Sequence, residues 1–217
     1  MPVEIASFPE PWPLIFDLLG YAKEPQKLSA RRKLPLSGVL KRKFNAADLC
    51  ARIDTLAPLA HVTALEEIVL CGARLVRDLG PLAELRNLKS VVMWQTGIQN
   101  LEALREKNKL KLLHVWCSEI ASLEPLTTTA ALEELNVEFT KIESLEPLAA
   151  LKKLRVLNIS GTNVASLDAL RDVPIANLLA YRTKLDARSL QEFEETHPAC
   201  AIERGDHYPE RHTRCGC

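Results

Sequence analysis

The sequence lacks an excess of charge of either sign, because its 28 lysine and arginine residues are balanced by 28 aspartate and glutamate residues. Net charge therefore favours neither a nucleic-acid nor a membrane-surface partner. Long apolar runs are also missing, since none approaches the roughly 18–20 residues that a membrane-spanning helix needs. The N-terminus has no basic segment before an apolar core, so it does not resemble a secretory signal. These absences predict a soluble, cytoplasmic protein that binds neither nucleic acid nor membrane.

Motifs for catalysis and cofactor binding are absent as well. The sequence contains no HExxH zinc motif, no phosphate-binding loop and no nucleophile elbow. It has six cysteines, but the chain is not small and shows no export signal, so reduced thiols are expected rather than disulfides. These features predict a protein without enzymatic activity, cofactor or small-molecule substrate.

The dominant feature of the sequence is an internal repeat over residues 65–185. Its units begin at steps of 23, 22, 22, 22 and 21 residues, at Leu65, Leu88, Leu110, Leu132, Leu154 and Ile175. Apolar residues recur three and five positions after each start, and a small, mostly hydroxyl residue recurs eight positions after it. Ten positions after each start stands another apolar residue, in order Leu75, Ile98, Ile120, Ile142, Val164 and Leu185. Such units are too short for a long α-helix, so they predict stacked coils with short 3₁₀ or irregular segments opposite the strands.

The pattern LxxLxLxxTxIxxLxPLxxLxx resembles leucine-rich repeats, and its length of 22 residues with LxPL in the return is most similar to the internalin subclass. A regulatory subunit of protein phosphatase 1 shares this type of repeat. The resemblance covers roughly residues 53–185. It implies an α/β fold, namely a right-handed, curved leucine-rich-repeat solenoid with a concave parallel β-sheet. It also implies protein binding much more often than catalysis.

The segments that flank the repeats are predicted to cap the two ends of the solenoid. Residues 1–64 combine a proline-rich stretch, a basic stretch and a degenerate half-repeat, and they form the expected N-terminal cap. Residues 65–185 hold the six repeats. Residues 186–203 predict a C-terminal cap, with a helix over 187–196 followed by a closing strand. Residues 204–217 have no apolar content to pack and are predicted to form a mobile tail.

The N-terminal region leaves two alternatives open. Residues 14–19 predict a short helical turn that covers the first coil, although the proline-rich start could instead be a docking peptide for another protein. Residues 21–43 are basic and could meet phosphates or an acidic partner, but a solvated loop is favoured because no aromatic residues interleave. A short strand over 39–44 and a helix that begins at Asn45 are also predicted.

Alternation along each strand predicts which side chains leave the core, because neighbouring residues of a strand point to opposite faces. Trp94 and Trp116 occupy the same outward position of adjacent units, so they should lie side by side, about 4.8 Å apart. An exposed apolar cluster with a polar rim marks an interaction site. The predicted partner-binding residues are Val92, Trp94, His114, Trp116, Glu134, Asn136, Glu138, Phe139 and Tyr181. Alternatively, the tryptophans shield each other or are covered by the N-terminal segment.

These patterns favour a non-enzymatic module that binds a protein partner on its concave face, as an inhibitor, adaptor or immunity-type protein. His114 could imitate a catalytic cluster with Glu134, Glu138 and either Cys117 or Cys71, but an open groove excludes water poorly. The alternative is a regulatory scaffold whose tail binds metal or is lipidated. Its candidate metal ligands are His207, His212, Cys215 and Cys217, whose spacing matches no familiar zinc module. The terminal Cys-Gly-Cys also looks like the end of doubly prenylated small GTPases.

Overall fold

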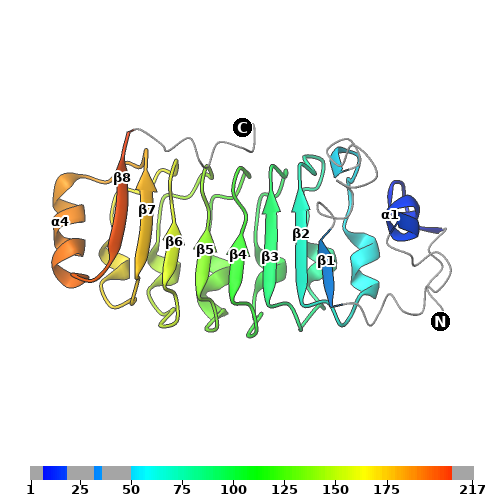
Figure 1. Ribbon diagram of the computed structural model, residues 1–217, viewed down its shortest axis with the longest axis horizontal. Helices are drawn as coiled ribbons and strands as arrows, with labels where there is room; N and C mark the ends of the chain where they lie inside the picture. Colours follow the sequence, from blue (N-terminus) through cyan, green and yellow to red (C-terminus); the bar gives the residue numbers. More distant parts are fainter. Residues whose placement is uncertain (1–6, 19–31, 36–49, 207–217) are drawn as a thin grey trace.

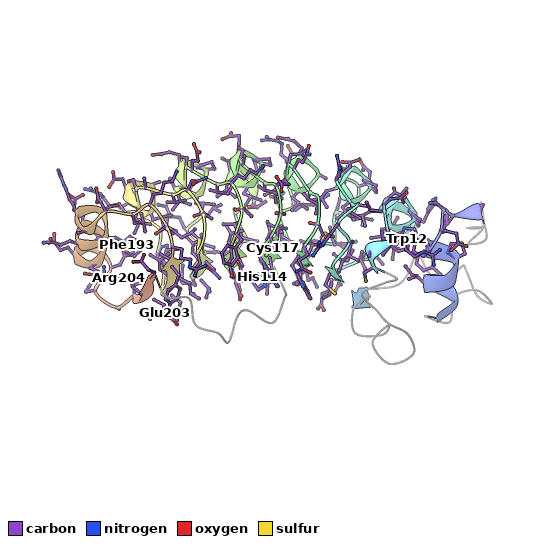
Figure 2. All side chains as sticks on the ribbon, turned by 90° about the horizontal axis from the view of Figure 1, so that it is seen from above. Trp12, His114, Cys117, Phe193, Glu203 and Arg204 are labelled. Carbon is purple, nitrogen blue, oxygen red and sulfur yellow. The ribbon has the colours of Figure 1, made fainter. Side chains whose placement is uncertain are left out.

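The computed structural model describes residues 7–18, 32–35 and 50–206, and it shows one parallel sheet of eight strands in chain order (Figure 1). The strands are β1 (Lys33–Pro35), β2 (Glu67–Cys71), β3 (Ser90–Trp94), β4 (Leu112–His114), β5 (Glu134–Asn136), β6 (Val156–Asn158), β7 (Asn177–Tyr181) and β8 (Ala201–Gly205). The opposite side carries the 3₁₀ helices η3 (Ala57–His61), η4 (Gly80–Leu82), η5 (Glu102–Leu104), η6 (Glu124–Thr128), η7 (Glu146–Leu148) and η8 (Asp168–Leu170). Seen from above, the coils form an arc with the strands on its inner side (Figure 2). The predicted leucine-rich-repeat solenoid is therefore confirmed.

The strands stack in a constant register, which lines up the repeat positions of successive coils. Leu113 of β4 pairs with Leu135 of β5, and Leu135 pairs with Leu157 of β6. All three side chains are fully buried. A single coil cannot bury its apolar strip alone, so each coil is stabilised by its neighbours.

The first unit departs from the predicted apolar columns. Leu75 was expected to point inward, but its side chain is 54% exposed, whereas that of Val76 is fully buried. The step from Leu65 to Leu88 is 23 residues long, and the additional residue lies in the turn after β2. This insertion shifts the inward position by one residue, so the prediction for Leu75 is wrong.

A ladder of hydroxyl groups holds the turns that follow the strands. Ser118, Thr140 and Thr162 each donate to the carbonyl oxygen three residues earlier, at 2.6 Å. Thr183 makes the same contact at 3.2 Å, whereas the buried hydroxyl of Thr96 has no hydrogen-bond partner. The predicted role of this column, to satisfy backbone groups at the turn, is confirmed in these four units.

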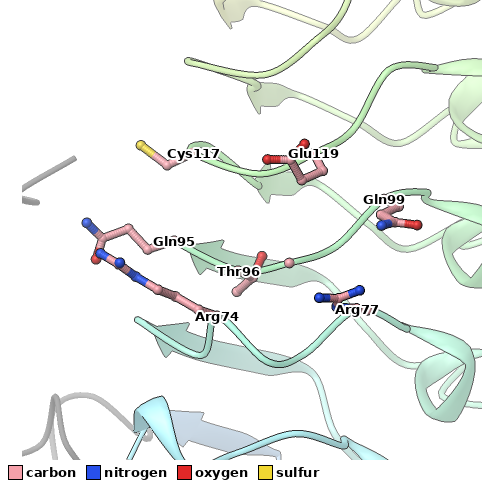
Figure 3. A pocket seen from close by; sticks show the side chains of 8 residues that line it. Arg74, Arg77, Gln95, Thr96, Gln99, Cys117 and Glu119 are labelled. Atoms are coloured by element: carbon pink, nitrogen blue, oxygen red, sulfur yellow. The ribbon is translucent and has the colours of Figure 1, made fainter.

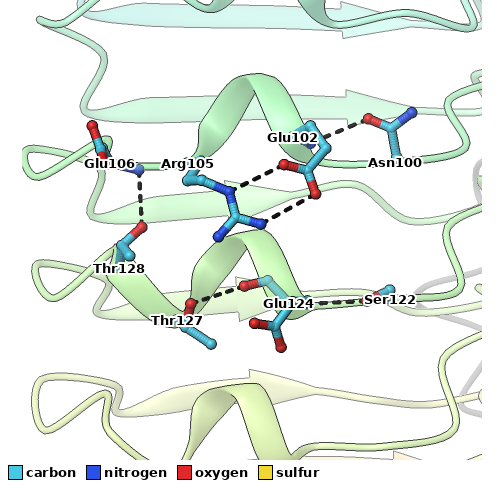
Figure 4. A network of polar contacts seen from close by, with 8 residues as sticks. All are labelled: Asn100, Glu102, Arg105, Glu106, Ser122, Glu124, Thr127 and Thr128. Atoms are coloured by element: carbon cyan, nitrogen blue, oxygen red, sulfur yellow. Dashed lines mark hydrogen bonds and ion pairs between the residues drawn. The ribbon is translucent and has the colours of Figure 1, made fainter.

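A second ladder, which the repeat pattern did not reveal, opens the 3₁₀ helices. One side-chain oxygen per coil accepts a hydrogen bond of 2.8–3.2 Å from the backbone N–H two residues later. The acceptors are Thr55, Asp78, Asn100, Ser122, Ser144 and Ser166. Figure 4 shows two of these contacts beside the exposed ion pair of Arg105 with Glu102, whose atoms lie 3.1 Å apart. These side chains satisfy N–H groups that a short helix leaves unpaired.

Lys107 occupies a position that carries an apolar residue in most coils. The column consists of Val62, Leu85, Lys107, Thr129, Leu151 and Val173. Lys107 is only 3% exposed, and its ammonium group donates to the carbonyl oxygen of Ala83. Burial lowers the pKa of Lys107, and the nearby Glu84 opposes that shift only in part.

The N-terminal end of the solenoid is covered by α1 (Trp12–Leu18), which begins slightly before the predicted turn. Its Trp12, Ile15 and Phe16 are fully buried, and the indole Nε1 of Trp12 donates to the carbonyl oxygen of Thr55 at 2.7 Å. The strand predicted over residues 39–44 and the start of the helix predicted at Asn45 lie outside the described residues. The first strand of the sheet is β1, which precedes that segment.

The C-terminal end is covered by α4 (Ala187–Thr196) and closed by β8. Asp186 caps α4, since its carboxylate accepts from the N–H of Ser189 at 2.7 Å. β8 continues through Arg204, which forms an ion pair of 3.0 Å with Glu194. Residues 204 and 205 therefore belong to the closing strand and not to the predicted mobile tail. Within the described part of the chain, no helix is long and apolar enough to cross a membrane.

Candidate binding surface on the concave face

Two tryptophan rings form a parallel stack on the concave face. The ring centroids of Trp94 and Trp116 are 4.9 Å apart, and the ring planes differ by 2°. The register of β3 and β4 produces this stack, because Val92 pairs with His114 two residues before the tryptophans. Both side chains are half-buried, since each covers one face of the other. Their predicted placement side by side is confirmed, and their role in binding stays a prediction.

His114 connects the tryptophan stack to an acidic side chain. Its Nε2 lies 2.7 Å from Oε1 of Glu134, and its ring meets Trp116 edge to face, with centroids 5.7 Å apart. The side chains of His114 and Glu134 are 20% and 38% exposed, respectively. The carboxylate of Glu134 therefore orients the imidazole of His114 beside the stack, and both side chains remain partly open to solvent.

Glu138 was predicted to be displayed on the concave face, and this prediction is wrong. The residue is 5% exposed, and its Oε2 accepts from the amide Nδ2 of Asn158 at 3.0 Å. Asn136 is also engaged within the chain, because its Oδ1 accepts from the N–H of Glu138 at 2.9 Å. Asn158 makes the equivalent contact to the N–H of Ser160 at 3.0 Å. These side chains bond to their own and neighbouring strands and so stiffen this part of the face.

One residue per coil adopts a left-handed backbone conformation at the carboxyl end of the strand. The column consists of Gly72, Gln95, Cys117, Phe139, Gly161 and Arg182, with φ between 50° and 72°. Non-glycine residues in this conformation store strain of about 1–3 kcal/mol each. Phe139 is 37% exposed, and a Cβ added to Gly161 would lie only 2.3 Å from the Phe139 ring. The sequence alone did not reveal this column, since only two of its members are glycines.

Tyr181 lies apart from the tryptophan stack, three strands further along the sheet. Its hydroxyl donates to Oε2 of Glu203 at 3.1 Å. Desolvation and this contact raise the pKa of Tyr181. The structure therefore brings together Val92, Trp94, His114, Trp116 and Glu134, and it places Tyr181 elsewhere.

A notch of about 510 Å³ opens beside the stack, at the carboxyl ends of β2 to β4 (Figure 3). Arg74 and Arg77 line it from one side, Gln95 and Thr96 from the middle, and Glu119 from the other side. Neither guanidinium group has an ion-pair partner among the described residues. A partner's carboxylate would find two cationic donors here.

The sequence predicts reduced thiols throughout, and this prediction is wrong for Cys117. Cys117 is disulfide-bonded, whereas Cys50, Cys71 and Cys200 carry reduced thiols. In this state Cys117 has no thiol that could act as a nucleophile beside His114. A hydrogen bond to Cys71, together with burial, raises the pKa of Cys50.

Among the described residues, no group of three or more histidine, cysteine, aspartate or glutamate side chains could hold a metal ion. The predicted metal ligands lie outside these residues: His207, His212, Cys215 and Cys217.

Comparison with known proteins identifies the fold. No protein-family model matches the chain, and no curated protein sequence matches it either. Internalin InlF from Listeria monocytogenes superposes with a TM-score of 0.60 at 19% identity, over 71% of this chain and 53% of that one. Internalin C2 from the same organism gives 0.53 at 21% identity, over 61% and 55%. The functional domain of its InlJ, which includes a cysteine ladder, gives 0.55 at 18% identity, over 67% and 31%.

The matched region thus spans about half the length of the first two internalins and less of the third. At this level of identity the likeness establishes an internalin-type leucine-rich-repeat fold. It agrees with the repeat type that the sequence predicted.

Proposed function

We propose that the protein is a non-enzymatic binding module that holds a protein partner on its concave face. The stack of Trp94 and Trp116 carries this proposal, because the two rings lie side by side on the concave face and both residues remain partly exposed. Tryptophan is enriched among the few interface residues that supply most of the binding energy. The stack offers a flat apolar anchor with polar groups around it.

The surface is rigid, which reduces the entropy lost on binding. The tryptophans lie on strands whose register is fixed by the parallel sheet. His114 is held by Glu134, and Asn136 is held by the backbone of Glu138. Little side-chain ordering would therefore be needed when a partner docks.

The charges around the stack indicate which chemical groups a partner would present. Glu134 offers a carboxylate on one side, while Arg74 and Arg77 offer cations at the notch on the other. We expect the partner to present an apolar or aromatic group flanked by a basic and an acidic side chain. A cytoplasmic inhibitor, adaptor or immunity-type protein would use such a surface without cofactor or catalysis.

Replacement of both tryptophans tests the proposal. Capture of partners from the native cell with the full chain is followed by affinity measurement with Trp94→Ala plus Trp116→Ala. Loss of a hot-spot pair is expected to cost at least about 2 kcal/mol, or roughly 30-fold in affinity. Arg105→Ala, on the outer side of the arc, is the matched control and should bind normally. A folded double variant that keeps full affinity would contradict the proposal.

A further inference from the structure

A glycine keeps the notch beside the tryptophan stack open. The residue directly after the hydroxyl position lacks a side chain in the second coil and carries one in each later coil, the series being Gly97, Glu119, Lys141, Asn163 and Lys184. Side chains at this position meet across neighbouring coils, since Lys141 forms an ion pair with Glu119. Gly97 offers no such side chain, so the space of about 510 Å³ between the first coil and Glu119 is not filled.

Close backbone packing at Gly97 holds two arginines at this opening. A Cβ added to Gly97 would lie 2.7 Å from the carbonyl oxygen of Arg74 and 3.2 Å from that of Val76. The turn that carries Arg74 and Arg77 therefore rests on the backbone of the next coil, and a larger residue at position 97 would push this turn away. Both arginines line the notch, and within the described part of the chain neither forms an ion pair.

Thr96 adds a hydroxyl group that the fold does not use. The residue lines the notch and is only 5% exposed, yet its hydroxyl has no hydrogen-bond partner. The equivalent hydroxyls of Ser118 and Thr140 donate to the carbonyl oxygen three residues earlier. Figure 3 shows Thr96 between the coil of the two arginines and the coil of Glu119. A buried hydroxyl without a partner destabilises the protein unless a ligand accepts from it.

We propose that the notch binds a carboxylate of the protein partner, held by Arg74, Arg77 and the hydroxyl of Thr96. Guanidinium groups match the two oxygens of a carboxylate, and such charge-assisted hydrogen bonds are stronger than neutral ones. The carboxylate comes from an aspartate or glutamate side chain or from the end of a chain, and it aligns the partner's neighbouring groups with the tryptophan stack. That the ligand belongs to a protein rests on the proposed function, whereas the site itself does not.

Glu119 on the opposite wall of the notch selects among anions. Its carboxylate lines the notch, and its ion pair with Lys141 is exposed, so its negative charge is offset only in part. A phosphate group with nearly two negative charges meets roughly twice the repulsion that a singly charged carboxylate meets. The notch therefore favours a carboxylate over a phosphate.

NMR titration of the full chain tests the site, with the Nε–Hε signals of Arg74 and Arg77 as reporters. The probes are N-acetylalanine for a chain end, N-acetylaspartate methylamide for an acidic side chain, and inorganic phosphate. Saturable shifts with a carboxylate probe are expected, and the carboxylate probe that binds more tightly identifies the source. Shifts that do not saturate, or tighter binding of phosphate than of both carboxylates, would overturn the proposal.

Replacement of Thr96 separates a role in binding from a role in the fold. Thr96→Val should lower carboxylate affinity about tenfold and raise the urea midpoint of the ligand-free protein, because it removes an unpartnered buried hydroxyl. Thr140→Val is the matched control, since the hydroxyl of Thr140 donates to the carbonyl oxygen of Val137 at 2.6 Å. This control should lower the urea midpoint and leave carboxylate affinity unchanged. A folded Thr96→Val variant with undiminished affinity, or one with a lowered midpoint, would refute the assignment of this hydroxyl to a ligand.

Replacement of the arginines tests the cationic wall. Arg74→Gln and Arg77→Gln should each lower carboxylate affinity about tenfold or more, with the remaining arginine as the reporter. Arg105→Gln, on the outer side of the arc, should bind the probes normally. If both notch variants bind as tightly as the wild type, the site is not there.

The double tryptophan variant separates this inference from the proposed function. Trp94→Ala plus Trp116→Ala leaves the residues of the notch in place, so it should still bind the carboxylate probes. Failure of the wild type to bind these probes would remove the notch alone. Conversely, a notch that binds carboxylate while the double variant keeps full affinity for the captured partner would contradict the proposed function and leave the notch standing.

Discussion

Truncation of the stacked tryptophans should destabilise the solenoid in a coupled way. Each ring is half-buried, and a fully buried tryptophan removes about 150–250 Å² from water. At about 25 cal/mol per Å², half of that area contributes roughly 2–3 kcal/mol, which is the expected loss for Trp94→Ala or Trp116→Ala. The stacked geometry, with planes 2° apart, adds about 0.5–1.5 kcal/mol that both single variants lose. The double variant should therefore cost less than the sum of the two by that amount.

Equilibrium unfolding in urea, followed by circular dichroism, measures the free energies for this double-mutant cycle. Leu75→Ala is the control, because Leu75 is 54% exposed and its truncation should change stability by less than about 0.5 kcal/mol. A cycle that is additive within about 0.3 kcal/mol would show that the rings are not coupled and would refute the stack.

Three further predictions concern the coils themselves. Val76→Ala should lower the free energy of unfolding in urea by roughly 2 kcal/mol, which is several times the loss expected for Leu75→Ala. Equal losses for the two variants would contradict the assignment of Val76, and not Leu75, to the buried column. Phe139→Gly should be more stable than Phe139→Ala by about 1 kcal/mol, because only glycine accepts φ of 50° without strain. Lys107→Leu should stabilise the protein by about 0.5–2 kcal/mol at neutral pH. Burial lowers the pKa of Lys107 in the folded state below its ordinary value of 10.5, so the wild type gains stability relative to Lys107→Leu as the pH rises towards 10.5. Urea unfolding at a series of pH values should therefore show the stability difference between the two proteins shrinking. A difference that does not change with pH would contradict a buried charge at Lys107.

The repeat period made most of the fold predictable, because register in a solenoid is set by spacing. Leu113, Leu135 and Leu157 fall into one buried column as their spacing requires. The period failed at Leu75, where two adjacent apolar residues compete for one inward position after an insertion. Periodicity identifies that a coil is one residue longer, but not where in the turn that residue lies.

The binding surface was predictable only in part, since alternation assigns a face and not a partner. It placed Trp94 and Trp116 side by side. It could not foresee that Glu138 turns to Asn158 and becomes buried, because that contact joins residues of neighbouring coils. The disulfide at Cys117 was missed for the same reason, as spacing in the chain gives no distance between cysteines.

The strained column points to the same part of the sheet as the tryptophans. Three consecutive coils carry side chains in the left-handed position, Gln95, Cys117 and Phe139, and the coils on either side carry glycine there. Glycine would remove about 1–2 kcal/mol of strain at each position, so stability alone favours glycine throughout. Arg182 has a structural use, because its Nε donates to the carbonyl oxygen of Asp206 at 3.2 Å. Gln95 and Cys117 line the notch beside the tryptophan stack, and Phe139 is 37% exposed on the next coil, so the three strained side chains lie on the coils of β3, β4 and β5, as the tryptophans do.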